Sequence, residues 1–307
     1  MNKKKSNWME KGDRLPVILL MPAALVVLIV MFVPLIYGLV MSCFNYKMGS
    51  IDLQNDFIGL KNYLQLFQDK VFLKAVWNTI YFTVLAITGD LIIGTIIAVW
   101  LNSLKPLVAK ILRPICTMPL LVSPIIIGLI WKYMFNINGG LLYWILEFFG
   151  IGPNEFPGLA SKTTAMLCVV IAHCWQVIPF VVIVLSAGLV SIPGEYYEAA
   201  DIDGAGFFRK FFTISLPGLK SVYMVILLFN GVDAIKVFDL IFSLTGGGPN
   251  NATMSLSLYA YKKGFDNFDM GYAMSISNVS MIISFLLFGL IFIRYNMKAQ
   301  KEGGVKG

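Results

Sequence analysis

One loop of this chain concentrates residues whose types and spacing suit the binding of a partner protein. The spaced positions are Glu198, Ala199, Ala200, Gly204, Ile214, Leu216 and Pro217. The glutamate can make a charge-assisted contact, the alanines allow close seating in a cleft, and the glycine permits a sharp reversal between two short helices. We therefore expect the loop at 191–217 to be a helix-turn-helix that docks on another protein.

The same loop could instead be a solvated connector between two membrane spans. Aromatic rings argue against that alternative, because exposed rings need a partner surface or the membrane to cover them. These rings belong to Phe207, Phe208, Phe211 and Phe212. We favour the docking interpretation.

Two ionisable residues fall inside apolar segments, where a charge is costly. Asp90 could line a transport path or relay protons, or it could bond a neighbouring helix, and it stays unassigned because no partner acid or base is apparent. His173, the only histidine, could be a proton switch, but a hydrogen-bonded helix contact is the favoured interpretation. One histidine cannot form a metal site, and neither a metal site nor a catalytic cluster is predicted.

A second set of polar and aromatic residues could recognise a sugar. Trp175 and Gln176 in one span, with Phe229 and Asn230 in another, combine flat apolar rings with amide hydrogen-bonding groups. We treat these four residues as candidates for a substrate pathway. The same residue types also occur in membrane-interface belts.

Asp233, Lys236 and Asp239 are spaced by three residues and are predicted to share one helix face. They could form a structural ion-pair ladder. Alternatively, this face could border the pathway or a partner subunit.

Membrane helices must position all of these residues. Hydrophobic residues make up 58% of the 307 residues, charged residues only 13%, and the mean hydropathy is +0.76. A bilayer crossing needs roughly 20 apolar residues, and the chain is predicted to be an all-α polytopic membrane protein with six such runs and one membrane domain at 15–293. The predicted spans are 15–44, 72–101, 111–135, 164–190, 219–244 and 272–293.

Basic residues predict the orientation. The net charge of +7 and the pI near 9.1 reflect cations at the ends of the spans rather than a nucleic-acid surface. Lys3, Lys4, Lys5 and Lys11 precede the first span, so the segment 1–14 and, after six crossings, the tail 294–307 are expected to be cytoplasmic.

The spacing in the 191–217 loop resembles the EAA motif of ABC importer permeases. Gly59-Leu60-Lys61-Asn62-Tyr63 and Phe238-Asp239 through Gly246-Gly247-Gly248-Pro249 resemble further segments of the carbohydrate-uptake group, specifically the maltose-type and glycerol-phosphate-type first permease subunit. The resemblance implies one half of a translocation pore that imports a sugar or oligosaccharide across a bacterial-type inner membrane by alternating access.

The resemblance also implies partners. These are a second homologous permease, two ABC ATPase subunits that bind ATP and Mg and dock on the 191–217 loop, and an extracellular solute-binding protein. The chain has no Gly-x-x-x-x-Gly-Lys-Ser/Thr phosphate loop, so it is expected to need no cofactor of its own and not to be an enzyme. The alternative is a proton- or ion-coupled secondary transporter that uses Asp90 and His173.

Overall fold

The computed structural model describes residues 14–49 and 56–303, so most of the predicted cytoplasmic segment 1–14 and the last residues of the tail lie outside it. Within the described residues the secondary structure is helical, with two isolated β-bridges and no strand. The predicted all-α class is confirmed. The helices longer than five residues are α2 (Arg14–Met41), α3 (Lys61–Leu66), α4 (Lys70–Ser103), α5 (Pro106–Thr117), α6 (Pro124–Met134), α7 (Leu141–Phe148), α8 (Ala165–Val190), α9 (Gly194–Ile202), α12 (Lys220–Ile235), α13 (Asp239–Leu244), α14 (Leu256–Tyr261), α15 (Met270–Ser284) and α16 (Leu290–Gly303).

Four helical segments are long and apolar enough to cross a membrane as single helices. They are Leu19–Met41, Lys70–Ser103, Ala165–Val190 and Met270–Tyr295. The last segment is continuous because a π-helical turn, η5 (Phe285–Gly289), joins α15 to α16. Two bent helix pairs raise the number of candidate spans to six if each pair counts as one.

One bent pair replaces the expected continuous span at 111–135, and the other bends at Leu219, where the expected span at 219–244 begins. α5, with the 3₁₀ turn η1 (Met118–Leu121), meets α6 at 98°. Proline explains this break, since Pro119 lies in the turn and Pro124 begins α6, and neither can donate a backbone hydrogen bond. The second pair bends by 65° where the 191–217 loop enters α12.

The expected fifth span also ends early. α12 stops at Ile235, Lys236 is its C-cap, and α13 begins at Asp239. Asp233, Lys236 and Asp239 therefore do not share one helix face, and the predicted ladder is wrong. Within the part of the chain that the structure describes, neither aspartate forms an ion pair with Lys236.

Close packing of α4 against α8 forms the centre of the bundle. Glycine permits this approach: a Cβ atom added at Gly94 would lie 2.5 Å from Val181 Cγ1, and one added at Gly89 would lie 2.9 Å from Cys174 Sγ. Phe82 and Ala86 on α4 are fully buried. The two helices therefore touch along the segment that carries Asp90 and His173.

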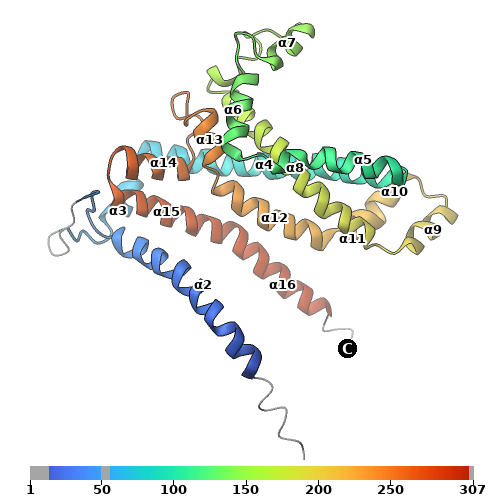
Figure 1. The fold of residues 1–307 in the computed structure, drawn as a ribbon, viewed down its shortest axis with the longest axis horizontal. Coiled ribbons are helices and arrows are strands. Elements are labelled where there is room, and N and C mark those ends of the chain that lie inside the picture. The colour runs from blue at the N-terminus through green and yellow to red at the C-terminus, as the bar shows by residue number, and fades with distance from the viewer. Residues whose placement is uncertain (1–13, 50–55, 304–307) are drawn as a thin grey trace, which may run out of the picture.

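The two ends of the bundle differ. α9 and the rest of the 191–217 loop lie at one end of α4 and α8, whereas α3 and α14 lie at the other (Figure 1). α2 stands apart from the bundle over most of its length, and none of its apolar window is buried within the chain. The loop and the outer segments are thus separated by the length of the central helices.

Candidate functional site

The 191–217 loop folds as two short helical arms that protrude from the bundle. The first arm is α9, and the second comprises α10 (Phe207–Lys210), the π-helical turn η3 (Phe211–Ser215) and α11 (Leu216–Gly218). The expected helix-turn-helix is thus present. Glu198, Ala199 and Ala200 lie on α9, Ile214 lies in η3, and Leu216 and Pro217 lie in α11.

The reversal between the two arms occurs at Gly204. Its φ is +66°, a left-handed conformation that glycine adopts without the steric cost of a Cβ atom. The Gly204 amide donates to the Asp201 carbonyl at 3.0 Å, and the Ala205 amide donates to the Ala200 carbonyl at 2.9 Å. These bonds satisfy the last carbonyls of α9 and fix the direction of the second arm.

Two side-chain contacts hold the arms together. The Tyr197 hydroxyl lies 2.9 Å from Ser215 Oγ, and Lys210 pairs with Asp201. At the base, a Cβ atom added at Gly188 would lie 2.6 Å from Leu219 Cδ2, so the end of α8 packs directly against the start of α12. The loop is a braced protrusion rather than a flexible connector.

The protrusion presents an uncovered apolar surface. α9 has no buried residue, and five large apolar or aromatic side chains of the loop are 60% or more exposed: Tyr196, Ile202, Phe207, Phe208 and Phe212. Phe211 is half-buried. Glu198 is exposed and makes no ion pair with any described residue. Exposed apolar side chains together with an exposed carboxylate on one protruding loop have the composition of a protein-docking site.

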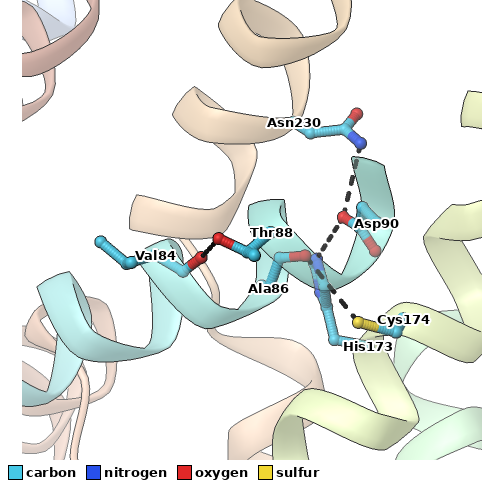
Figure 2. Close-up of polar contacts among 7 residues, drawn as sticks. All are labelled: Val84, Ala86, Thr88, Asp90, His173, Cys174 and Asn230. Atoms are coloured by element: carbon cyan, nitrogen blue, oxygen red, sulfur yellow. Dashed lines mark hydrogen bonds and ion pairs between the residues drawn. The ribbon is translucent and has the colours of Figure 1, made fainter. Parts of the chain in front are cut away.

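A buried polar cluster lies in the centre of the bundle (Figure 2). Asp90 Oδ2 on α4 lies 3.6 Å from His173 Nε2 on α8 and accepts a 3.4 Å hydrogen bond from Asn230 Nδ2 on α12. Asp90 is completely buried, and His173 and Asn230 are 7% and 6% exposed. The two residues that sequence reasoning left without a charged partner are therefore each other's neighbours.

The contacts of this cluster are incomplete. The Asp90–His173 distance suits a charge–charge contact but exceeds a normal hydrogen bond. Asp90 Oδ1 and His173 Nε2 are both buried without a hydrogen-bond partner among the described residues. The imidazole also packs edge-on against the Phe82 ring, with 5.1 Å between ring centroids. The cluster joins α4, α8 and α12 at one point, but not every polar atom in it has a hydrogen-bond partner among the described residues.

The four candidate pathway residues lie in different surroundings. Trp175 packs against Trp131 of α6, with ring centroids 6.1 Å apart, and Gln176 donates to the Val122 carbonyl at 3.4 Å, in the break before α6. Phe229 is 64% exposed, whereas Asn230 is engaged by Asp90. A cavity of about 1030 Å³ borders α12, α14 and α15, but none of the four residues lines it.

Sequence reasoning missed a polar cluster at the other end of the bundle. Asp69 Oδ1 caps α4 by accepting from the Val71 and Phe72 amides, and Oδ2 accepts from the phenols of Tyr259 and Tyr272. Burial would raise the pKa of Asp69, but the phenol and amide hydrogen bonds outweigh it and lower the pKa below its usual value. An aspartate directly before a helix is a capping signal, but its two tyrosine partners are 190 and 203 residues away, beyond any local pattern.

A helical bundle with several candidate spans and a braced loop at one end is the architecture of a membrane-embedded transport subunit. Residues 90–300 match the family described as "Binding-protein-dependent transport system inner membrane component", and the chain belongs to that family. It is a multi-pass membrane protein and a permease subunit of an ABC importer, a transport component rather than an enzyme. The alternative of an ion-coupled secondary transporter is not favoured.

The chain is similar over most of its length to several named transport proteins. The trehalose/maltose transport system permease protein MalF of Thermococcus litoralis is 38% identical over 76% of this chain and 79% of the relative. The sulfoquinovosyl glycerol transport system permease protein SmoG of Agrobacterium fabrum is 32% identical over 91% of this chain and 90% of the relative. The fold is similar to a chain of a bacterial alginate ABC transporter solved with an alginate pentasaccharide-bound periplasmic protein, with a TM-score of 0.78 and 22% identity over 92% of this chain and 95% of that chain.

Proposed function

We propose that this chain forms one half of the translocation pathway for a sugar or oligosaccharide and receives the motion of an ATPase through the 191–217 loop. The observation that carries the proposal is the braced, uncovered loop at one end of the bundle. Glu198, Ala199, Ala200 and Gly204 form its tip and first arm. Ile214, Leu216 and Pro217 connect the second arm to α12.

The mechanical role follows from how the loop is built. A surface that transmits a displacement must resist bending, and the Tyr197–Ser215 and Asp201–Lys210 contacts stiffen the two arms. The small side chains of Ala199 and Ala200 leave room for a partner to approach α9 closely. Exposed Phe207 and Phe208 supply apolar area, which dominates the stability of most protein contacts.

The proposed assembly contains a second homologous permease, two ABC ATPase subunits that bind and hydrolyse ATP with Mg, and an extracellular solute-binding protein. The description of the family states that transport depends on a binding protein, which supports the last of these partners. The 191–217 loop, and with it both chain termini, is assigned to the cytoplasmic side, because Lys105, Lys110, Arg113, Arg209 and Lys210 lie at that end of the spans.

A carbohydrate cargo is supported by the names of the relatives, which include transporters of trehalose and maltose and of sulfoquinovosyl glycerol. The rings of Trp175 and Phe229 could stack on a sugar face, and the Gln176 amide could hydrogen-bond hydroxyl groups. Asn230 is buried beside this surface and bonds Asp90 instead. In alternating access, closure of the ATPase pair opens this pathway outward to receive the cargo from the binding protein.

The test is assembly and stimulation of the complete importer. An affinity-tagged chain is co-expressed with its candidate ATPase, second permease and binding protein, and ATP hydrolysis is measured with maltose, trehalose and sulfoquinovosyl glycerol as probes. We expect both ATPase copies to co-purify and at least one probe to stimulate hydrolysis. Transport by the chain alone, driven by a proton gradient, would contradict the proposal.

A pair of glycine substitutions examines the loop itself. Gly204→Val forces a β-branched residue into a left-handed conformation, so the second arm should be misdirected and stimulated hydrolysis should fall by at least about tenfold. Gly38→Val on α2 is the control, because Gly38 lies outside the loop, has open space around it and has an ordinary φ. Both variants should insert into the membrane. Wild-type stimulation in Gly204→Val would refute the role of the loop.

A further inference from the structure

We propose that Asp90 is a positioning residue that ties α8 and α12 to α4, so that the helix entering the 191–217 loop and the helix leaving it move together. The inference deepens the proposed function and rests on it for its physiological role. Its structural part, the fixed spacing of α8 and α12, can be measured independently.

The location of Asp90 relative to the loop supports this role. α8 runs directly into the loop at Val190, and α12 begins just after it at Lys220. Asp90 Oδ2 contacts one side chain from each of these helices, at 3.6 Å from His173 and 3.4 Å from Asn230 (Figure 2). A single carboxylate oxygen on α4 is thus shared by the two helices that carry the loop.

Further contacts connect this point to the base of the loop. Thr95 Oγ1 on α4 lies 2.8 Å from the Tyr223 hydroxyl on α12. This contact lies between the Asp90–Asn230 bond and the loop. On the other side, Gly94 allows α4 to touch α8 at Val181. With the close approach of Gly188 to Leu219, the three helices form a continuous packed unit from the cluster to the loop, as transmission of a displacement requires.

A carboxylate at this point is better explained by positioning than by stability. Burying an acid costs free energy unless it is fully paired, and apolar side chains of similar volume often stabilise a buried site equally well. Asp90 is fully buried, yet its Oδ1 has no hydrogen-bond partner among the described residues. The contacts of Oδ2, which are a hydrogen bond from Asn230 and a close approach to His173, instead specify which faces of α12 and α8 meet α4.

The test measures the spacing of α8 and α12 in the assembled complex. Spin labels are attached at Ile183→Cys on α8 and Val225→Cys on α12, both exposed positions, in a background where Cys43 and Cys116 are replaced by serine. The spin–spin distance distribution is recorded in lipid nanodiscs without nucleotide and with ATP plus vanadate. For the otherwise wild-type chain we expect one narrow population in each state.

Asp90→Leu should broaden the distribution at least about twofold, because the hydrogen bond from Asn230 and the polar contact with His173 are both lost. Asp90→Asn should retain the narrow distribution, since its side-chain oxygen can take the place of Oδ2, accept from Asn230 and lie beside His173. The matched control is Thr88→Val: Thr88 lies on the same helix, and its hydroxyl bonds only its own helix at the Val84 carbonyl, 2.7 Å away (Figure 2). It should behave as wild type.

A wild-type width in Asp90→Leu would overturn the inference. If that variant fails to assemble, His173→Leu, which removes only the α8 contact, must broaden the distribution, and an unchanged width overturns the inference equally. A different result would contradict the proposed function: the ATPase subunits would not co-purify with the wild-type chain. Asp90→Leu should still bind these subunits, because its loop is unaltered.

Discussion

The Tyr272 phenol donates a 2.8 Å hydrogen bond to Asp69 Oδ2, which joins the residue before α4 to the first turn of α15. Because Tyr259 donates to the same oxygen from α14, one carboxylate fastens three helices at the end of the bundle opposite the 191–217 loop. The hydrogen bonds favour the ionised acid and lower its pKa against the opposing effect of burial.

This geometry predicts a loss of stability in acid. A group whose pKa is lowered by folding stabilises the folded state at pH values above its unfolded pKa, which is 3.8 for this carboxyl, and that contribution disappears as the pH falls through the lower folded-state pKa. Tyr272→Phe should cost about 1 kcal/mol at neutral pH and should flatten the acid limb of a melting-temperature profile. Tyr81→Phe, at an exposed ring that stacks on Trp77, is the control, and equal profiles for the two variants would contradict the prediction.

Helix contact at Gly94 predicts a steric effect. Gly94→Ala places a Cβ atom 2.5 Å from Val181 Cγ1, so α4 and α8 must separate, at a cost of about 1–3 kcal/mol. Adding Val181→Ala should restore part of the melting temperature, because it removes the methyl group at 2.5 Å and leaves only the Val181 Cβ atom at 2.9 Å in close contact. Gly38→Ala on α2, with nothing within 4 Å, should melt as wild type. A double variant no better than Gly94→Ala would rule out this contact as the cause.

The exposed rings of the 191–217 loop predict a binding defect without a folding defect. Phe208→Ser removes a side chain that is 74% exposed, so the melting temperature of the isolated chain should not change. If the ring is covered by an ATPase, its loss should weaken that complex by about 1–3 kcal/mol, which is roughly 5- to 150-fold in Kd. Titration of the ATPase against the permease in nanodiscs measures this.

Phe149→Ser is the matched control, because Phe149 is 71% exposed but lies just after α7, away from the loop. Equal ATPase affinity for the two serine variants would show that the ring of Phe208 is not part of the docking surface.

The substrate-pathway proposal predicts a transport defect with intact assembly. Phe229→Ala removes a ring that is 64% exposed on α12. If the ring stacks on the sugar, kcat/KM for uptake of the probe should fall by an amount equivalent to about 1–3 kcal/mol. ATPase co-purification should be unaffected. Val225→Ala, at an exposed apolar position on the same helix, should transport normally, and a loss of uptake that is equal in both variants would assign the effect to helix packing.

The class of fold and the existence of the loop could be predicted from local patterns. Apolar runs mark α4 and α8 because a helix that crosses a membrane must be apolar over its whole length. Glycine at 204 marks the reversal because few other residues adopt its φ. These features depend on residues close together in the chain.

The polar clusters could not be predicted, since they depend on how distant helices pack. Asp90 and His173 were each identified as unusual, but their contact requires the rotation and depth of α4 and α8, which hydrophobicity does not specify. The early end of α12 was missed for a related reason. Apolar residues continue on both sides of Lys236, and no proline or glycine marks the break between α12 and α13. α13 packs against α6, where Gly128 faces Ser243.

α2 contacts the remainder of the chain mainly near its end, where Asn278 donates to the Gly38 carbonyl at 3.4 Å. None of its apolar window is buried by the other residues that the structure describes. The fold of the bundle therefore requires little of the α2 sequence beyond hydrophobicity and length. The α2 sequence can vary, or adapt to neighbouring molecules, without changing how the other helices pack.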